Sequence, residues 1–185
     1  MGGLEMLIPA AAAIFLVAFA FLIFRLFFSL EKNSKVIVRT EKRTPFALES
    51  MTDTDAVLYC SVPFENLGGQ YGTLVDCVVR PQLPFEQYDG IDARGKAEVE
   101  GKPREDDYFE ATLVDSHNSL NILIKVRLTA RKGMDIKTAL SRMVDLPLDF
   151  IYTELSRNPW QLKKFRVVLT AEEIASLTGV TLIDA

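Results

Sequence analysis

The side chains best suited to catalysis are few and form no familiar catalytic pattern. The single histidine, His117, lies in the polar run Asp-Ser-His-Asn-Ser between two apolar stretches. Cys60 and Cys77 have apolar neighbours, which predicts inert thiols rather than reactive thiolates. A general base must lie beside a nucleophile, and nothing in the sequence pairs His117 with either cysteine. We therefore expect a solvated loop histidine, no enzyme activity and no cofactor.

Metal and phosphate sites are not expected either. One histidine and two cysteines are too few to complete a tetrahedral zinc site. The acidic segments 89–92 and 105–107 offer oxygen ligands, but neither has the spacing of a calcium-binding loop. The glycines at 68, 69 and 72 are not followed by the Gly-Lys-Ser/Thr of a phosphate-binding loop. These segments are better interpreted as charged surface turns and a hairpin turn.

The first candidate for an interaction is the only tryptophan, Trp160, which is close to Lys163 and Lys164 at an expected turn. An amphipathic ring beside cations can rest at a membrane interface or anchor a protein partner. The alternative is that Trp160 folds back over the end of the domain and the lysines are solvated.

The second candidate is the proline-punctuated segment 80–88, which carries Phe85 and Tyr88. Exposed aromatic residues on an extended loop are typical of a docking loop. An ordinary connection between two sheets explains the same residues equally well.

The elements that position these side chains are expected to be mainly strands. Residues 120–129 alternate between apolar and polar side chains, which predicts a half-buried strand. Shorter runs of similar character occur at 36–39, 56–62, 73–79, 96–100, 108–114, 148–155 and 165–169. Short strands separated by Gly, Pro and Asn turns predict an antiparallel β-sandwich, immunoglobulin-like or jelly-roll-like, over residues 55–185.

Two short helices are expected within the sandwich domain. Residues 135–145 place apolar side chains at helical spacing and are followed by Pro147. Near the C-terminus, Thr170 and Glu173 have the spacing of a capping box, and Gly179 is a suitable C-terminal cap.

The N-terminal residues 1–30 predict a transmembrane α-helix. Leu7 to Phe24 contains no charged side chain, and eighteen helical residues span about 27 Å, close to the bilayer core. We expect Leu7, Ile14 and Phe24 to contact lipid and Arg25 to reach the headgroups. A buried core helix would show a polar face, and a cleaved signal peptide would begin with basic residues.

The charge distribution predicts the orientation. Basic residues are absent before the apolar run and frequent between Arg25 and Arg43, so residues 31–54 form a basic collar and connector. The positive-inside rule places the domain in the cytoplasm and the N-terminus outside. In the cytoplasm Cys60 and Cys77 would be reduced, whereas outside they could form a disulfide. The acidic remainder argues against a nucleic-acid partner.

These observations favour a single-pass membrane protein whose β-sandwich is a non-enzymatic interaction or scaffold module at the membrane surface. Its expected partners are membrane lipid and another membrane or membrane-associated protein. The alternative is an anchored extracytoplasmic carrier or bridge for lipids or other apolar ligands. That function requires an apolar groove in the sandwich.

Overall fold

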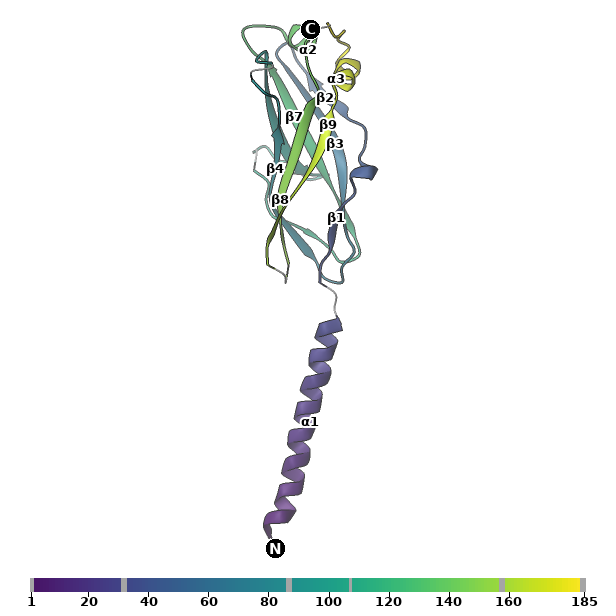
Figure 1. Ribbon diagram of the computed structural model, residues 1–185, viewed down its shortest axis with the longest axis vertical. Helices are drawn as coiled ribbons and strands as arrows, with labels where there is room; N and C mark the ends of the chain where they lie inside the picture. Colours follow the sequence, from purple (N-terminus) through teal and green to yellow (C-terminus); the bar gives the residue numbers. More distant parts are fainter. Residues whose placement is uncertain (1, 31–32, 86–87, 107, 157–158, 184–185) are drawn as a thin grey trace.

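The structure is a computed structural model that describes residues 2–30, 33–85, 88–106, 108–156 and 159–183. Within the N-terminal helix α1 (Gly2–Leu30), side chains are described for residues 11–26. Figure 1 shows α1 projecting from one end of a β-sandwich, with two short helices and the C-terminus at the opposite end. The expectation of a mainly β, antiparallel fold with a few helices is confirmed.

The first sheet has the order β1-β3-β7-β5, and β2 pairs with β3 along the same edge as β1. All of its pairs are antiparallel. A short 3-10 turn, η1 (Thr40–Lys42), separates β1 from β2. The strands are β1 (Val36–Val38), β2 (Ala47–Met51), β3 (Asp55–Asn66), β5 (Ile91–Val99) and β7 (Ser119–Ala130).

The second sheet has the order β6-β4-β8-β9 and is also antiparallel. Its strands are β4 (Gly72–Pro81), β6 (Thr112–Val114), β8 (Leu146–Leu155) and β9 (Gln161–Leu169). The chain passes from the first sheet to the second at β3–β4, β5–β6 and β7–β8, and it returns at β4–β5 and β6–β7.

The strand expected from each apolar run is present, and β2 is an additional strand. Residues 36–51 of the expected connector therefore contribute β1 and β2 to the first sheet. The sequence gives little sign of β2 because this edge strand has a bulge between Leu48 and Ser50 and buries no side chain completely. Without a continuous buried face, the apolar alternation that identifies a strand is lost.

The core lies between the two sheets, and the paired strands β3 and β7 supply its side chains from the first sheet. Alternate side chains of both strands are fully buried, for example Leu58 and Cys60 on β3 and Ile124 and Val126 on β7. The second sheet adds the inward side chains of β8, including Phe150. Removing this apolar surface from water is the main force that joins the two layers.

Four aromatic rings fill part of the space between the sheets. Phe64 of the first sheet contacts Phe150, Tyr152 and Phe165 of the second, with ring centroids 5.4–6.0 Å apart. Phe150 and Phe165 stack at 4.9 Å. These rings occupy space that an apolar ligand groove between the sheets would need.

The two short helices are capped differently. Helix α2 (Ile136–Leu140) begins at Asp135, whose carboxylate accepts the Thr138 N–H at 2.9 Å. It is shorter than expected because tight turns, such as Met143 N–H to Leu140 O at 3.0 Å, follow it. Helix α3 (Ala171–Thr178) has the predicted capping box of Thr170 and Glu173, and Gly179 adopts the left-handed conformation at φ 66°.

Candidate interaction surfaces

The side chain of Asn66 joins three segments at the end of the sandwich where α1 projects. Its Oδ1 accepts the N–H groups of Lys35 at 3.0 Å and Gly68 at 2.9 Å. Its Nδ2 donates to the carbonyls of Gln70 at 2.7 Å and Val114 at 3.0 Å. Asn66 is fully buried, and these four bonds satisfy the capacity of one amide side chain.

Asn66 thereby fixes the segment between α1 and β1. We call residues 33–35 the linker and residues 67–71 the β3–β4 turn. The Leu67 N–H donates to Lys35 O at 2.9 Å. A Cβ on Gly68 would lie 2.1 Å from the Asn33 carbonyl oxygen, so only glycine allows this close approach. The linker is therefore packed against the β3–β4 turn.

Large apolar side chains are exposed at this same end of the molecule. We call them the α1-proximal patch, and their exposed fractions run from 39% to 67%. The patch consists of Leu67, Tyr71, Leu113, Leu155, Trp160 and Leu162.

Strand register explains why several of these side chains share one face. Leu113 pairs with Thr73, and Thr73 pairs with Leu155, so the two leucines flank Thr73 on the outer face of the second sheet. Leu162 pairs with Thr153, two residues before Leu155, and lies on that face as well. The patch is therefore continuous with the outer face of the second sheet.

Trp160 does not fold back over the sandwich, because its side chain is 67% exposed. The two lysines near it are bound to carboxylates rather than free. Lys163 forms an ion pair with Glu154, and Lys164 Nζ lies 3.3 Å from Asp149. Lys163 and Lys164 are consecutive residues of β9, so their side chains point to opposite faces of the sheet. They therefore do not form one basic surface beside Trp160.

Asp149 is the centre of the ion pairs on the second sheet. Its carboxylate is nearly buried and accepts two bonds from Arg166, at 2.7 Å and 3.1 Å. The two hydrogen bonds from Arg166, together with the one from Lys164, lower the pKa of Asp149 from its ordinary 3.8 to about 2. Bidentate pairing of this kind is the strongest of the ion pairs on protein surfaces.

This shift predicts an acid-dependent loss of stability. Because the folded-state pKa of Asp149 is depressed, its ion pairs stabilise the fold above about pH 4 and are lost as pH falls toward 2. The variant Asp149→Asn should therefore melt below the unmodified chain at pH 7, and the difference should shrink between pH 4 and 2. Thermal unfolding followed by circular dichroism across this range measures the difference. A pH-independent difference for Asp149→Asn would contradict the assignment.

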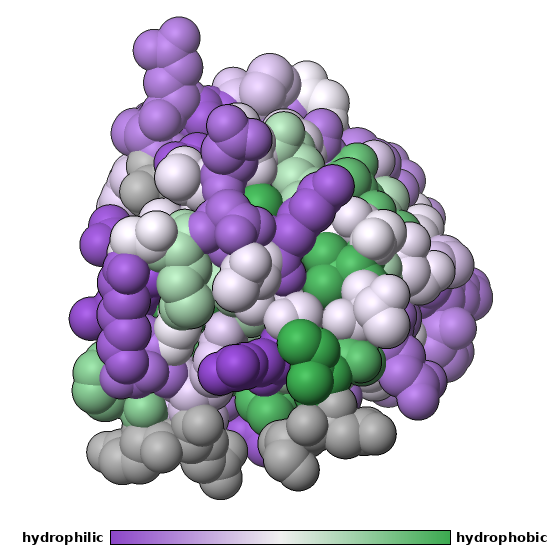
Figure 2. Space-filling model, turned by 90° about the horizontal axis from the view of Figure 1, so that it is seen from above, coloured by the Kyte–Doolittle hydropathy of each residue, from purple (hydrophilic) through white to green (hydrophobic). Residues whose placement is uncertain are grey.

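The candidate loop residues Phe85 and Tyr88 lie at the other end of the sandwich. The Tyr88 hydroxyl donates to the Ala139 carbonyl of α2, and burial raises the pKa of Tyr88. The Arg131 guanidinium lies 5.0 Å from the centre of the Phe85 ring, which is 57% exposed. Figure 2 shows this end, where apolar side chains gather in small groups between polar ones. The two candidate segments therefore do not form one surface.

A groove with a volume of about 640 Å³ lies on the outer face of the first sheet. Residues of β2, β3, β5 and β7 line it together with the segment 103–105. Lys125 lies 2.7 Å from Glu49 and 3.3 Å from the nearly buried Glu98. Lys96 donates to Arg104 O at 2.7 Å, which holds the segment over the sheet. Sequence reasoning missed this groove because five separate segments contribute to it.

The residues first considered for catalysis remain apart. His117, at φ 55°, lines a shallow groove with Arg39 and Glu65, which form an ion pair at 2.6 Å. Cys60 and Cys77 are free and buried, and burial raises the pKa of Cys60 to about 11. Among the described residues, no group of three or more His, Cys, Asp or Glu side chains is arranged to hold a metal ion.

Helix α1 carries the residues expected to anchor the chain. Ile14 is 70% exposed and Phe24 is 59% exposed, and Arg25 is exposed as well. The side chain of Leu7 lies outside the described residues. Within the described part of the chain, no helix combines the length and the apolar character needed to cross a bilayer. The spanning helix expected from the sequence therefore stays a prediction.

Comparison with known proteins gives little further guidance. No protein-family model matches the chain, and no curated protein matches it. The structure of the yeast GGA1 GAE domain-P21 aligns at a TM-score of 0.33 and 9% identity, over 67% of this chain and 97% of that one. The GAE domain of GGA2p from Saccharomyces cerevisiae aligns at 0.32 and 9%, over 75% and 98%. Likenesses this distant carry no conclusion about the fold or function of this chain.

Proposed function

We propose that this chain is a membrane-tethered β-sandwich that acts as a non-enzymatic interaction module for another protein at the membrane surface. The observation that carries the proposal is the surface of α1, whose described large apolar side chains are 52% to 70% exposed. These side chains are Ile14, Phe15, Leu16, Val17, Phe19, Phe21, Leu22, Ile23, Phe24 and Leu26. A contiguous exposed apolar surface of this extent marks a site that contacts a membrane or another protein.

A bilayer suits α1 better than a protein groove does. An amphipathic helix that docks on a protein has one polar face, whereas residues 11–26 carry apolar or alanine side chains all round apart from Arg25. The helix also satisfies its own backbone hydrogen bonds, as a lipid environment demands. The sandwich has its own closed core, so α1 is free to serve as a tether.

The groove on the outer face of the first sheet supports a protein partner. Its lining carries cations such as Arg94 and Lys125 beside anions such as Glu49 and Asp92. Such a surface is complementary to another protein surface of mixed charge rather than to an apolar ligand. A tether raises the effective concentration of this groove near partners in the same membrane.

We place the sandwich on the cytoplasmic side. The basic residues that follow the apolar run support this orientation. The two cysteines support it as well, because both are free and buried within separate sheets, as expected for a reducing compartment.

The strand order also favours an immunoglobulin-like sandwich over a jelly roll. One sheet of the immunoglobulin fold has the strand order A-B-E-D. The first sheet has this order if β1, β3, β7 and β5 correspond to A, B, E and D. In the second sheet, β4, β8 and β9 then correspond to C, F and G. The chain departs from the immunoglobulin pattern at β6. This strand pairs with β4 at the edge of the second sheet, but it follows β5, the strand at the D position, in the chain.

Charges introduced into α1 test the tether. In the double variant Phe19→Glu with Leu22→Glu, each carboxylate costs about 3 kcal/mol at the centre of a membrane helix. The unmodified chain should stay in the membrane pellet after alkaline carbonate extraction, and the double variant should move to the supernatant. Val78→Glu with Val168→Glu is the matched control, because it places two charges at exposed sites of the sandwich. Extraction of the unmodified chain by carbonate would contradict the tether.

One engineered thiol tests both the orientation and the partner. The Arg94 side chain is 79% exposed at the groove, and the native thiols are buried, so Arg94→Cys should be the only site that reacts. In sealed cells, a membrane-impermeant maleimide should label Arg94→Cys only after the membrane is opened. A cleavable cross-linker at the same site should then yield a defined heteromeric adduct. Labelling of intact cells would refute the orientation, and recovery of the lone chain would count against the interaction module.

A further inference from the structure

We propose that the α1-proximal patch inserts into the lipid interface, so that the sandwich rests on the bilayer through its β3–β4 turn and the start of β9. This inference rests on the proposed tether, and it adds a second membrane contact made by the folded domain itself.

The linker keeps the patch close to the end of α1. Residues 31–35 separate Leu30 from β1, and an extended chain covers at most about 3.5 Å per residue, so Lys35 lies within about 18 Å of the helix end. Lys35 is bonded to both Asn66 and Leu67, and Leu67 belongs to the patch. A bilayer that holds α1 therefore has the β3–β4 turn at its surface.

The chemistry of the patch fits the lipid interface. Tyr71 and Trp160 are each 67% exposed, and such rings gather where headgroups meet acyl chains. The four leucines of the patch add apolar area that water does not favour. The nearby lysines are already paired with Glu154 and Asp149, so the contact depends on apolar burial rather than on attraction to anionic lipid.

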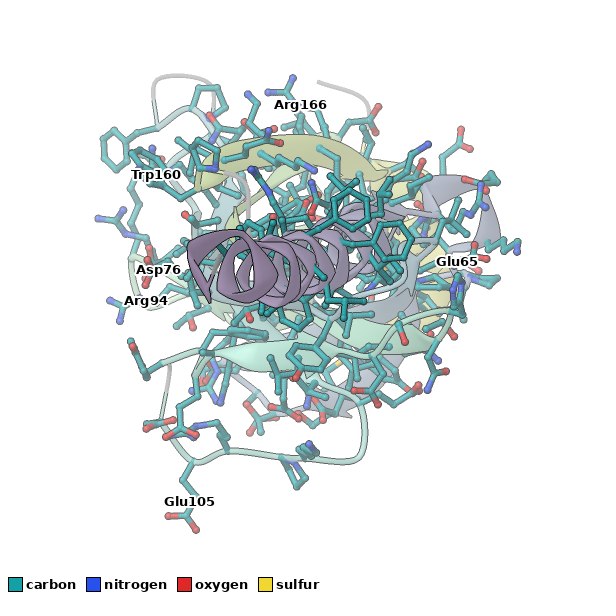
Figure 3. The ribbon with its side chains drawn as sticks, turned by 90° about the horizontal axis from the view of Figure 1, so that it is seen from below. Glu65, Asp76, Arg94, Glu105, Trp160 and Arg166 are labelled. Carbon is teal, nitrogen blue, oxygen red and sulfur yellow. The ribbon has the colours of Figure 1, made fainter. Side chains whose placement is uncertain are left out.

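The other side of the same end is polar, which gives the sandwich a preferred tilt. There the 115–118 turn carries His117, and Arg39 pairs with Glu65. In the view from below, Trp160 and Glu65 lie on opposite sides of α1 (Figure 3). The second sheet should therefore tilt toward the membrane, which leaves the charged groove of the first sheet open.

Trp160 is the only tryptophan in the chain, so its fluorescence reports on the patch alone. The full chain is reconstituted into phosphatidylcholine vesicles with and without bromine on the acyl chains. We expect Trp160 emission to shift to shorter wavelength on reconstitution and to be strongly quenched by the brominated lipid, equally at low and high salt. The double variant Trp160→Phe with Phe85→Trp moves the probe to the far end of the sandwich and should not be quenched.

The outcomes separate this inference from the tether. Flotation with the vesicles without quenching of Trp160 would overturn the patch contact and leave the tether intact. A blue shift that brominated lipid does not quench would mean that protein, such as a second copy, covers the patch. Failure to float with the vesicles would overturn both proposals. Leu162→Asp and, as a second variant, Tyr71→Asp should each reduce quenching while far-ultraviolet circular dichroism stays unchanged.

Discussion

The buried amide of Asn66 is the constraint on which the arrangement of this molecule depends. Its side chain makes four hydrogen bonds, which reach the linker, the β3–β4 turn and the end of β6. Each buried polar group left unpaired would cost about 1–3 kcal/mol, so these segments hold one arrangement together. The linker that follows α1 is thereby held beside Leu67, a member of the exposed apolar patch.

The molecule divides its apolar residues between two uses. In the sandwich, alternate side chains of β3 and β7 face the second sheet and are fully buried, and the ring of Phe64 locks the layers together. In α1, apolar side chains surround the helix and remain exposed. The first pattern requires a second sheet, and the second is the observation on which the proposed tether rests.

The sequence predicted what depends on local pattern and missed what depends on distant contacts. The alternation of 120–129 and the capping box at Thr170 reproduce β7 and the start of α3, because both arise from neighbouring residues. The hydrogen bonds of Asn66 join residues up to 48 positions apart, and no local sequence pattern around Asn66 predicts them. Trp160, Lys163 and Lys164 were identified by their chemistry, but the ion pairs of the two lysines were not predicted, because the carboxylate partners lie on the adjacent strand β8.

Amide hydrogen exchange of the full chain in lipid nanodiscs tests the central claim most directly. The account predicts that α1 amides exchange slowly in lipid, and that the Lys35 and Leu67 amides exchange as slowly as those of β3 in the unmodified chain. In the Asn66→Ala variant, the Lys35 and Gly68 amides lose their acceptor and should become fast, together with the Leu67 amide that donates to Lys35, while α1 stays protected. Rapid exchange of α1 in nanodiscs, or of Lys35 and Leu67 in the unmodified chain, would contradict the account.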